Sequence, residues 1–201
     1  MLAILGASGH GKVLADIAEL TGWDKVVFFD DAWPEVQRNG AWEVVGNTQK
    51  LLTTLSDYNG VIVAIGNNNI RQSKFRQLKD AGAKITSLIH PSATVSRYSN
   101  IGPGSVVVAG AVINPFCTIG SGAIINTCSS VGHDCTLGDM VHICPGAKLA
   151  GGTTVGDRAW VGIGSSVRQL ISIGSDTVVG AGSVVVKDIL ENTTVMGVPA
   201  K

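Results

Sequence analysis

VVAGAV-INPFCT-IGSGAI-INTCSS-VGHDCT-LGDMVH, residues 107–142, is six consecutive copies of a six-residue unit that begins with Val or an equivalent aliphatic residue. The unit recurs without a slip from Ile89 to Leu190, seventeen times in all. If about one position in three held Val, Ile or Leu, such a run would arise roughly once in 10^8 trials, so chance is excluded. The first positions of the repeat are Ile89, Val95, Ile101, Val107, Ile113, Ile119, Ile125, Val131, Leu137, Ile143, Leu149, Val155, Val161, Val167, Ile173, Val179 and Val185.

A six-residue period fits a short strand followed by a turn and does not fit a 3.6-residue helix. Three units close a triangular coil, with the first-position side chains on the axis of the prism. Glycine recurs at the second and fourth positions, where tight corners need backbone angles that a Cβ resists. Stacked coils bury a column of aliphatic side chains that a single coil cannot hide, so residues 89–201 are predicted to form a solenoid.

The first 88 residues have a different pattern, in which short apolar runs alternate with helical stretches. This alternation predicts a βαβαβαβ domain, which is typical of a small parallel sheet with helices on its faces. At this length it corresponds to half of a Rossmann-like nucleotide-binding fold, and Ile89-His90-Pro91 marks its boundary. The expected strands are 2–5, 26–29, 61–65 and 84–88, and the expected helices are about 12–20, 48–55 and 70–81.

A glycine-rich loop, Gly6-Ala7-Ser8-Gly9-His10-Gly11, follows the first expected strand and opens the first helix. Its backbone amides and the helix N-terminus favour a phosphate. The G-x-x-G-x-G spacing differs from the G-x-G-x-x-G of dinucleotide enzymes, which argues against a nicotinamide cofactor. The alternative is that these glycines only make a tight strand-to-helix turn.

Polar residues follow two further strands, at the edge where parallel sheets bind ligands. Asp30-Asp31 ends the second strand, and Gly66-Asn67-Asn68-Asn69 follows the third. A carboxylate there can accept hydrogen bonds from a base or a sugar hydroxyl. Two acids at a strand end are also ordinary solvated turn residues.

Composition excludes several classes of protein. Fifteen basic and fifteen acidic residues cancel at a pI near 6.9, which gives no electrostatic case for nucleic acid. Glycine and polar residues interrupt every apolar run before about 18 residues, so no transmembrane helix is expected. The sequence enters an expected strand at once, so no signal peptide is expected, and a cytoplasmic location is the default expectation.

All four cysteines lie in the repeat, without C-x-x-C spacing, and their positions favour small buried thiols over disulfides or metal ligands. They are Cys117, Cys128, Cys135 and Cys144.

Two histidines, His133 and His142, fall in the middle of the solenoid. His133 occupies a third position of the repeat, which faces outward, and an imidazole with an ordinary pKa near about 6.5 can act as a general base. The neighbouring Asp134 can accept the other ring proton and orient the base. Two alternatives are a turn-capping histidine and a zinc site. Zinc catalysis needs three histidine ligands, and His90, the third available, lies more than two coils away, so no metal is expected.

With both halves in view, the chain resembles the bacterial hexapeptide-repeat acetyltransferases that act on nucleotide-linked amino sugars, a group that includes UDP-N-acetylbacillosamine N-acetyltransferase and the sialic acid O-acetyltransferases. The resemblance covers nearly the whole chain. It rests on Gly6-Ala-Ser-Gly-His-Gly11, Asp30-Asp31, Ala64-Ile65-Gly66-Asn67-Asn68, Leu88-Ile89-His90, Ser129-Ser130-Val131-Gly132-His133-Asp134-Cys135 and Gly197-Val198-Pro199-Ala200-Lys201.

The resemblance implies a left-handed parallel β-helix that assembles as a homotrimer, with acetyl-CoA as co-substrate and active sites between neighbouring subunits. It implies that His133 is the base and Asp134 its orienter, and that the backbone N–H of Gly151 stabilises the oxyanion. The implied acetyl-CoA contacts are His142, Gly151, Ile163, Ala181, Gly197 and Pro199. The implied nucleotide-sugar contacts are Ser8, Gly9, His10, Asp30, Asp31 and Gly66.

This chain departs from a relative's pattern in having Asp134 where a glutamate follows the histidine, and Ala181 in place of a glycine. The implied reaction is direct N-acetylation of a UDP-linked 4-amino-4,6-dideoxy sugar for a bacterial surface glycan or glycoprotein. O-acetylation of a sialic or related acid, and a non-catalytic scaffold that binds a nucleotide sugar, are the alternatives.

Overall fold

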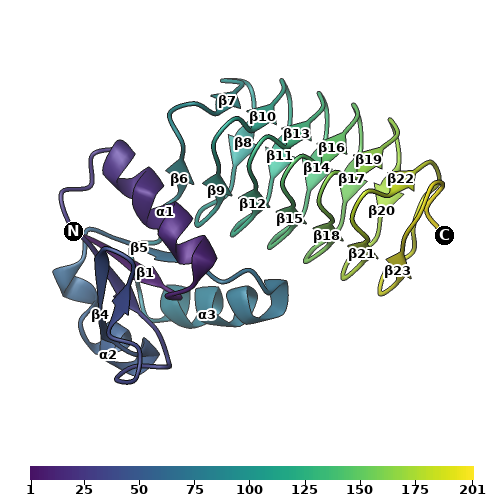
Figure 1. The fold of residues 1–201 in the computed structure, drawn as a ribbon. Helices are drawn as coiled ribbons and strands as arrows, with labels where there is room; N and C mark the ends of the chain where they lie inside the picture. Colours follow the sequence, from purple (N-terminus) through teal and green to yellow (C-terminus); the bar gives the residue numbers. More distant parts are fainter. The chain divides into compact units, whose positions relative to one another are not determined.

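From Thr94 to Val185, each six-residue repeat forms a two-residue strand followed by a turn. Strands eighteen residues apart pair in parallel, as Ile113 does with Val131, and Val131 with Leu149. This is a parallel β-helix with three strands per coil, as the repeat predicts, and its coils stack in sequence order (Figure 1). The strands are β7 (Thr94–Val95), β8 (Asn100–Ile101), β9 (Val106–Val107), β10 (Val112–Ile113), β11 (Thr118–Ile119), β12 (Ile124–Ile125), β13 (Ser130–Val131), β14 (Thr136–Leu137), β15 (His142–Ile143), β16 (Lys148–Leu149), β17 (Thr154–Val155), β18 (Trp160–Val161), β19 (Ser166–Val167), β20 (Ser172–Ile173), β21 (Val178–Val179), β22 (Val184–Val185) and β23 (Thr194–Val195).

The computed structural model describes all 201 residues, and its chain divides into two units, Met1–Pro91 and Ser92–Lys201. In the second unit the strands form three faces, in the orders β22-β19-β16-β13-β10-β7, β20-β17-β14-β11-β8 and β23-β21-β18-β15-β12-β9. The first-position side chains from Val107 to Val185 are all buried and form one apolar core. Ile89, the first residue of the predicted repeat, is instead 40% exposed.

Small side chains at the fifth position fill the inner corners of the prism. Ser105, Ser129 and Ser165 are fully buried there. Each hydroxyl donates to a backbone carbonyl, at 2.9, 2.7 and 2.9 Å respectively. A buried polar group needs such a partner, so the three hydroxyls are satisfied inside the prism.

The first unit is a small, mostly parallel sheet with the strand order β3-β4-β2-β1-β5. All residues of β1, β2 and β5 are buried, as expected for strands inside a parallel sheet. The elements are β1 (Leu2–Leu5), α1 (Gly9–Leu20), β2 (Val26–Phe29), β3 (Arg38–Asn39), β4 (Trp42–Gly46), α2 (Thr48–Thr53), a short 3-10 helix at Leu55–Asp57, β5 (Gly60–Val63), α3 (Asn68–Asp80) and β6 (Leu88–Ile89).

Two features of this sheet differ from the prediction. The antiparallel hairpin β3–β4 was not expected, although β4 is the parallel neighbour of β2. The predicted strand over 84–88 is wrong in extent, because only Ile85 forms an isolated bridge, with Val61, and β6 begins at Leu88. Polar Thr86 and Ser87 interrupt the apolar run between them.

The cysteines are all free, and three of them are buried as predicted. The prediction of a buried thiol is wrong for Cys128, which is exposed. Cys128 lies at a fourth repeat position, in a left-handed turn with φ 54°, where the side chain points away from the core. No helix in the structure combines the length and the apolar character needed to cross a membrane.

Candidate active site

Three successive turns on one edge of the solenoid bring the predicted catalytic residues together. His133 follows β13, Gly151 follows β16 and Gln169 follows β19, each eighteen residues after the last. The Gly152 N–H donates to the His133 carbonyl at 2.8 Å, and the Leu170 N–H donates to the Gly151 carbonyl at 3.0 Å. The eighteen-residue coil therefore fixes the backbone at the site without long loops.

His133 and Asp134 form a close pair at this edge. The His133 Nδ1 lies 2.6 Å from the Asp134 Oδ2, and the side chains are 70% and 61% exposed. Because an ionised carboxylate only accepts hydrogen bonds, this contact favours the tautomer of the neutral imidazole that has its proton on Nδ1 and its lone pair on Nε2. Asp134 adopts a left-handed conformation with φ 59°, which aspartate tolerates better than most residues. The structure therefore places His133 and Asp134 in contact at the surface, and the role of His133 as a base stays a prediction.

The absence of a side chain on Gly151 leaves room for the His133 imidazole. A Cβ on Gly151 would lie 2.6 Å from both Cε1 and Nε2 of His133, so the ring lies directly over the glycine. The Gly151 N–H donates to no group of the chain. A cavity of about 280 Å³ opens beside the ring and is lined by His133, Asp134, Gly151, Gly152, Gln169 and Leu170. A base, a free N–H donor and an adjoining cavity are the parts that acyl transfer needs.

The other residues expected to contact acetyl-CoA lie on a different part of the solenoid. Ile163 and Ala181 are exposed at another edge, and the Gly182 N–H donates to the Ile163 carbonyl at 2.7 Å. The Gly197 N–H donates to Ser183 Oγ at 3.1 Å, and Pro199 follows close by. Within one chain, the cavity beside His133 includes none of these residues.

His142 lies on the face between edges and is only 6% exposed. Its Nε2 lies 3.0 Å from the Asn126 Nδ2, and its ring packs edge-on against Trp160 with centroids 4.2 Å apart. Neither Asn126 nor Trp160 was predicted as a site residue. Only Trp160 has a signal in the spacing, since it follows His142 by eighteen residues and pairs with it; Asn126 lies two residues after Ile124, the equivalent of His142 in the preceding coil.

The histidines of the alternative zinc site, His90, His133 and His142, do not form a metal-binding cluster. No group of three His, Cys, Asp or Glu side chains in the structure could hold a metal ion.

In the first unit, the glycine-rich loop is tied to the end of β2. Gly6 has φ 116°, and a Cβ there would lie 2.8 Å from the Ala64 carbonyl oxygen, so only glycine fits. The Ala7 N–H donates to Asp30 Oδ2 at 2.7 Å, and the Ala32 N–H donates to Asp30 Oδ1 at 2.9 Å. Asp30 therefore holds the loop in shape. Ser8 and Gly9 are exposed at the start of α1, where the backbone amides are open to an anion.

Asp31 belongs to a second polar cluster at the same sheet edge. Its Oδ2 accepts from Lys74 Nζ at 2.6 Å, and its Oδ1 accepts from the Thr48 N–H at 2.9 Å. Burial pushes the pKa of Asp31 upward, but the hydrogen bonds from Lys74 and Thr48 outweigh it and lower the pKa to about 2. Asp31 is therefore ionised at neutral pH, and 56% of its side chain is exposed to a ligand.

His10 and Arg71 are the buried titratable groups beside the loop. Burial, together with the charge of Arg71, lowers the pKa of His10 to about 4, so its imidazole is neutral. Its Nε2 is buried without a hydrogen-bond partner. Arg71 is 1% exposed and donates to the carbonyls of Ile65 and Gly66 at 2.9 and 3.0 Å. Gly66 thus contributes its carbonyl to the fold, and sequence reasoning missed both Arg71 and Lys74.

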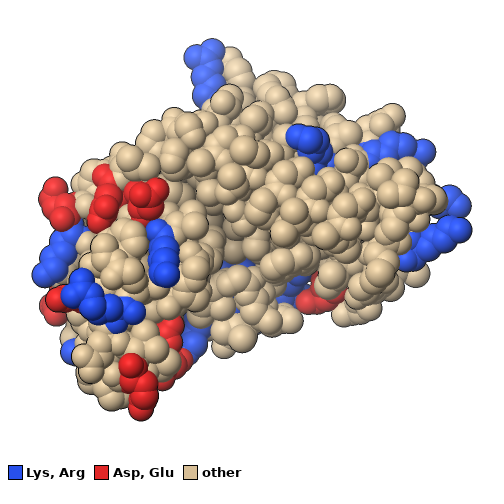
Figure 2. All heavy atoms as spheres, viewed as in Figure 1, with Lys and Arg blue, Asp and Glu red and all other residues tan.

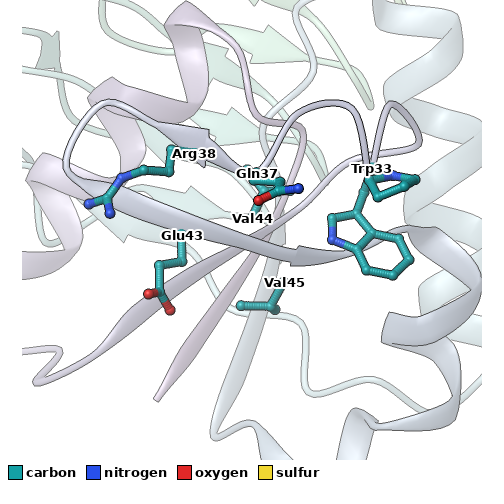
Figure 3. Close-up of a pocket in the computed structure, with 7 residues that line it drawn as sticks. Trp33, Gln37, Arg38, Glu43, Val44 and Val45 are labelled. Atoms are coloured by element: carbon teal, nitrogen blue, oxygen red, sulfur yellow. The ribbon is translucent and has the colours of Figure 1, made fainter.

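A separate cavity of about 470 Å³ lies beside the β3–β4 hairpin. Figure 3 shows Trp33 at one end and Arg38 at the other, with Glu43 and Val45 projecting from β4. None of the predicted site residues lines it. The hairpin that forms this cavity was itself absent from the prediction.

Comparison with known proteins shows which proteins the chain is similar to. Residues 1–78 match the PglD N-terminal domain family. The chain is 42% identical to the acetyltransferase domain of PglB from Neisseria gonorrhoeae, solved with acetyl coenzyme A, with a TM-score of 0.96 over 100% of this chain and 97% of that one. It is 40% identical to perosamine N-acetyltransferase from Caulobacter crescentus, solved as a histidine-to-asparagine mutant with CoA and GDP-perosamine, with a TM-score of 0.93 over 100% and 95% of the two chains.

The curated UDP-N-acetylbacillosamine N-acetyltransferase of Bacillus subtilis (strain 168) is 34% identical over 114 residues, which span 54% of this chain and 51% of that protein. The chain thus matches about half the length of that relative, but nearly the full length of the two solved structures. Its parallel β-helix and its preceding α/β unit are shared with them. The chain belongs to the hexapeptide-repeat family of nucleotide-sugar N-acetyltransferases.

Proposed function

We propose that this chain transfers the acetyl group of acetyl-CoA to the 4-amino group of a UDP-linked 4-amino-4,6-dideoxy sugar. The observation that carries the proposal is the His133–Asp134 pair, which lies over Gly151 and beside a cavity of about 280 Å³. The names of the relatives support the reaction class, since they include enzymes of UDP- and GDP-linked amino sugars.

In the proposed mechanism His133 is the general base. Asp134 holds the Nδ1 proton, so Nε2 accepts a proton from the sugar amine as the nitrogen attacks the acetyl carbonyl carbon. The C–N bond forms first and gives a tetrahedral intermediate; the C–S bond breaks when this intermediate collapses, and the coenzyme A thiolate leaves. The proton on His133 then neutralises that thiolate. No covalent enzyme intermediate is needed.

The tetrahedral intermediate carries a negative oxygen that needs a donor. The Gly151 N–H has no partner in the chain, and Gly151 lies beneath the His133 ring. A backbone donor of this kind is fixed before the reaction and needs no reorganisation. We assign it to the oxyanion.

The nucleotide is proposed to bind to the first unit. The open amides at Ser8 and Gly9 suit a phosphate, and the exposed carboxylate of Asp31 suits hydroxyl donors of a ribose. The neutral, unpartnered Nε2 of His10 can make one further hydrogen bond. Asp30 and Gly66 are proposed to contribute by shaping the loop, because their oxygens already bond to the chain.

A homotrimer explains why the acetyl-CoA residues form two groups. His133 and Gly151 share one edge of the prism, while Ile163 and Ala181 share another. Packing solenoids side by side places one edge against a different edge of the next subunit. Ile163, Leu170 and Val198 are 60%, 77% and 75% exposed, which suits such an interface. Figure 2 shows few charged side chains over much of the second unit on the face drawn there.

The reaction is tested by incubating the purified protein with acetyl-CoA and UDP-, GDP- or dTDP-linked 4-amino sugars, together with free and CMP-linked sialic acid. Thiol release and product mass are followed. Acetylation of a UDP-amino sugar is the expected outcome. Turnover of only a GDP- or dTDP-sugar would refute UDP as the nucleotide carrier. Turnover of only a sialic acid would show O-acetylation, and no turnover would favour a non-catalytic scaffold.

The role of His133 is tested by His133→Ala. We expect kcat/KM to fall by about 10²- to 10⁴-fold, the range for loss of a general base. Sedimentation should still give a trimer, because the side chain is 70% exposed and supports no core. Near-normal turnover in this variant would exclude His133 as the base.

A further inference from the structure

A stacked pair of exposed aromatic rings adjoins the catalytic pair. Tyr98 and Phe116 are 55% and 63% exposed, with ring centroids 5.7 Å apart and an angle of 29° between the planes. Tyr98, Phe116 and Asp134 are eighteen residues apart, so they occupy the same corner of three successive coils. The Asp134 N–H donates to the Pro115 carbonyl at 3.1 Å, which places the Phe116 turn directly against the catalytic turn.

The fold gains little from a phenylalanine at this corner. Phe116 has φ 64°, a left-handed conformation that is unfavourable for a bulky side chain. The equivalent corner two coils later holds Gly152, at φ 67°. The ring also stays largely in water instead of joining the core. A strained and exposed aromatic next to a catalytic pair is better explained by a ligand than by folding.

The two sides of His133 suit different reactants. On the side of the later coils lies the cavity of about 280 Å³ that Gly151 and Gly152 help to line, and the thioester is assigned to this side. The aromatic stack lies on the side of the earlier coils, and successive coils are about 5 Å apart. The flat C–H face of a pyranose ring packs well on an aromatic face, as does a 6-methyl group. Arg97 lies over the Tyr98 ring, 4.9 Å from its centroid, and braces the outer end of the stack.

We propose that Tyr98 and Phe116 form the platform on which the sugar ring of the acceptor rests, so that Phe116 positions the amine for His133. This inference rests on the proposed function and deepens it by naming the acceptor side of the site. The platform selects for a sugar with an apolar face or a deoxy position beside the amine. A fully hydroxylated sugar would place polar groups on the rings without hydrogen-bond partners.

The backbone of Phe116 supplies a clean test. Phe116→Gly removes the ring and places at φ 64° the residue that adopts this conformation most readily, so folding should be preserved. Phe116→Tyr keeps an aromatic face. Leu190→Ala is the matched control, because Leu190 is 79% exposed and lies far along the chain from this corner. For each variant we measure kcat, both KM values and the sedimentation coefficient.

We expect Phe116→Gly to raise the KM for the nucleotide sugar about 3- to 10-fold, in the range of a lost aromatic contact. The KM for acetyl-CoA and the sedimentation coefficient should not change, and Phe116→Tyr and Leu190→Ala should behave like the wild type. A rise only in the KM for acetyl-CoA would assign the stack to the adenine, and dissociation of the oligomer would assign it to a second copy of the chain. Either result, or unchanged KM values, would refute the proposal that the two rings hold the acceptor sugar. An inactive wild type would instead refute the proposed function.

Discussion

Gly151→Ala tests whether the glycine under His133 sets the position of the base. The added Cβ would lie 2.6 Å from Cε1 and Nε2 of the ring, whereas carbon atoms in contact prefer about 3.5 to 4.0 Å. The imidazole must therefore move by about 1 Å. A displacement of that size at a reacting group costs roughly 10²-fold in rate, so we expect kcat/KM to fall by about that factor.

Stability should change little in the same variant. Gly151 does not have a positive φ, so alanine fits its backbone, and the displaced ring can turn into solvent because it is 70% exposed. We expect the free energy of unfolding to stay within about 0.5 kcal/mol of the wild type. The Gly151 N–H is retained, so the proposed oxyanion donor remains present.

A double-mutant cycle separates this effect from a blocked cavity. Initial rates with saturating acetyl-CoA are measured for Gly151→Ala, His133→Ala and the double variant. If the alanine acts through the imidazole, it should have no further effect once His133 is absent. A full 10²-fold loss in the His133→Ala background, or no loss in the wild-type background, would refute the reasoning.

Two further predictions concern the first unit. Asp30→Ala removes the acceptor of the Ala7 and Ala32 N–H groups, so the KM for the nucleotide sugar should rise by about tenfold while the KM for acetyl-CoA stays constant. Asp31→Ala, at the same edge, is the comparison. If Asp30→Ala raised both KM values equally, a role confined to the loop would be contradicted. His10 has its pKa lowered to about 4, below its ordinary value, so between about pH 6.5 and 4 the unfolded chain binds a proton that the folded chain does not. The free energy of unfolding should therefore decrease as the pH is lowered across that window, by at most about 1.4 kcal/mol per pH unit. Chemical denaturation of the wild type and of His10→Asn measures this, and identical slopes for the two would show that another group is responsible.

The sequence by itself determined the architecture, because the solenoid has a local, repeating cause. Each aliphatic first position from Val107 to Val185 faces the axis, and stacking the coils buries them together. The same regularity placed His133 outward and Asp134 beside it. The loop from Gly6 to Gly11 was also readable, since a glycine is required where the chain turns sharply at φ 116°.

What the tertiary structure alone decided lies in contacts between distant segments. The β3–β4 hairpin was missed because Arg38–Asn39 is too short to show a strand pattern. Arg71 and Lys74 are polar residues within the predicted helix over 70–81, and nothing in the sequence marks them as site residues. Only the fold brings Lys74 to Asp31, 43 residues away. Cys128 and Phe116 look like interior residues by composition, yet left-handed corners turn them outward. A repeat fixes which residues face the axis, but the partners of the outward residues depend on how coils and helices come together in space.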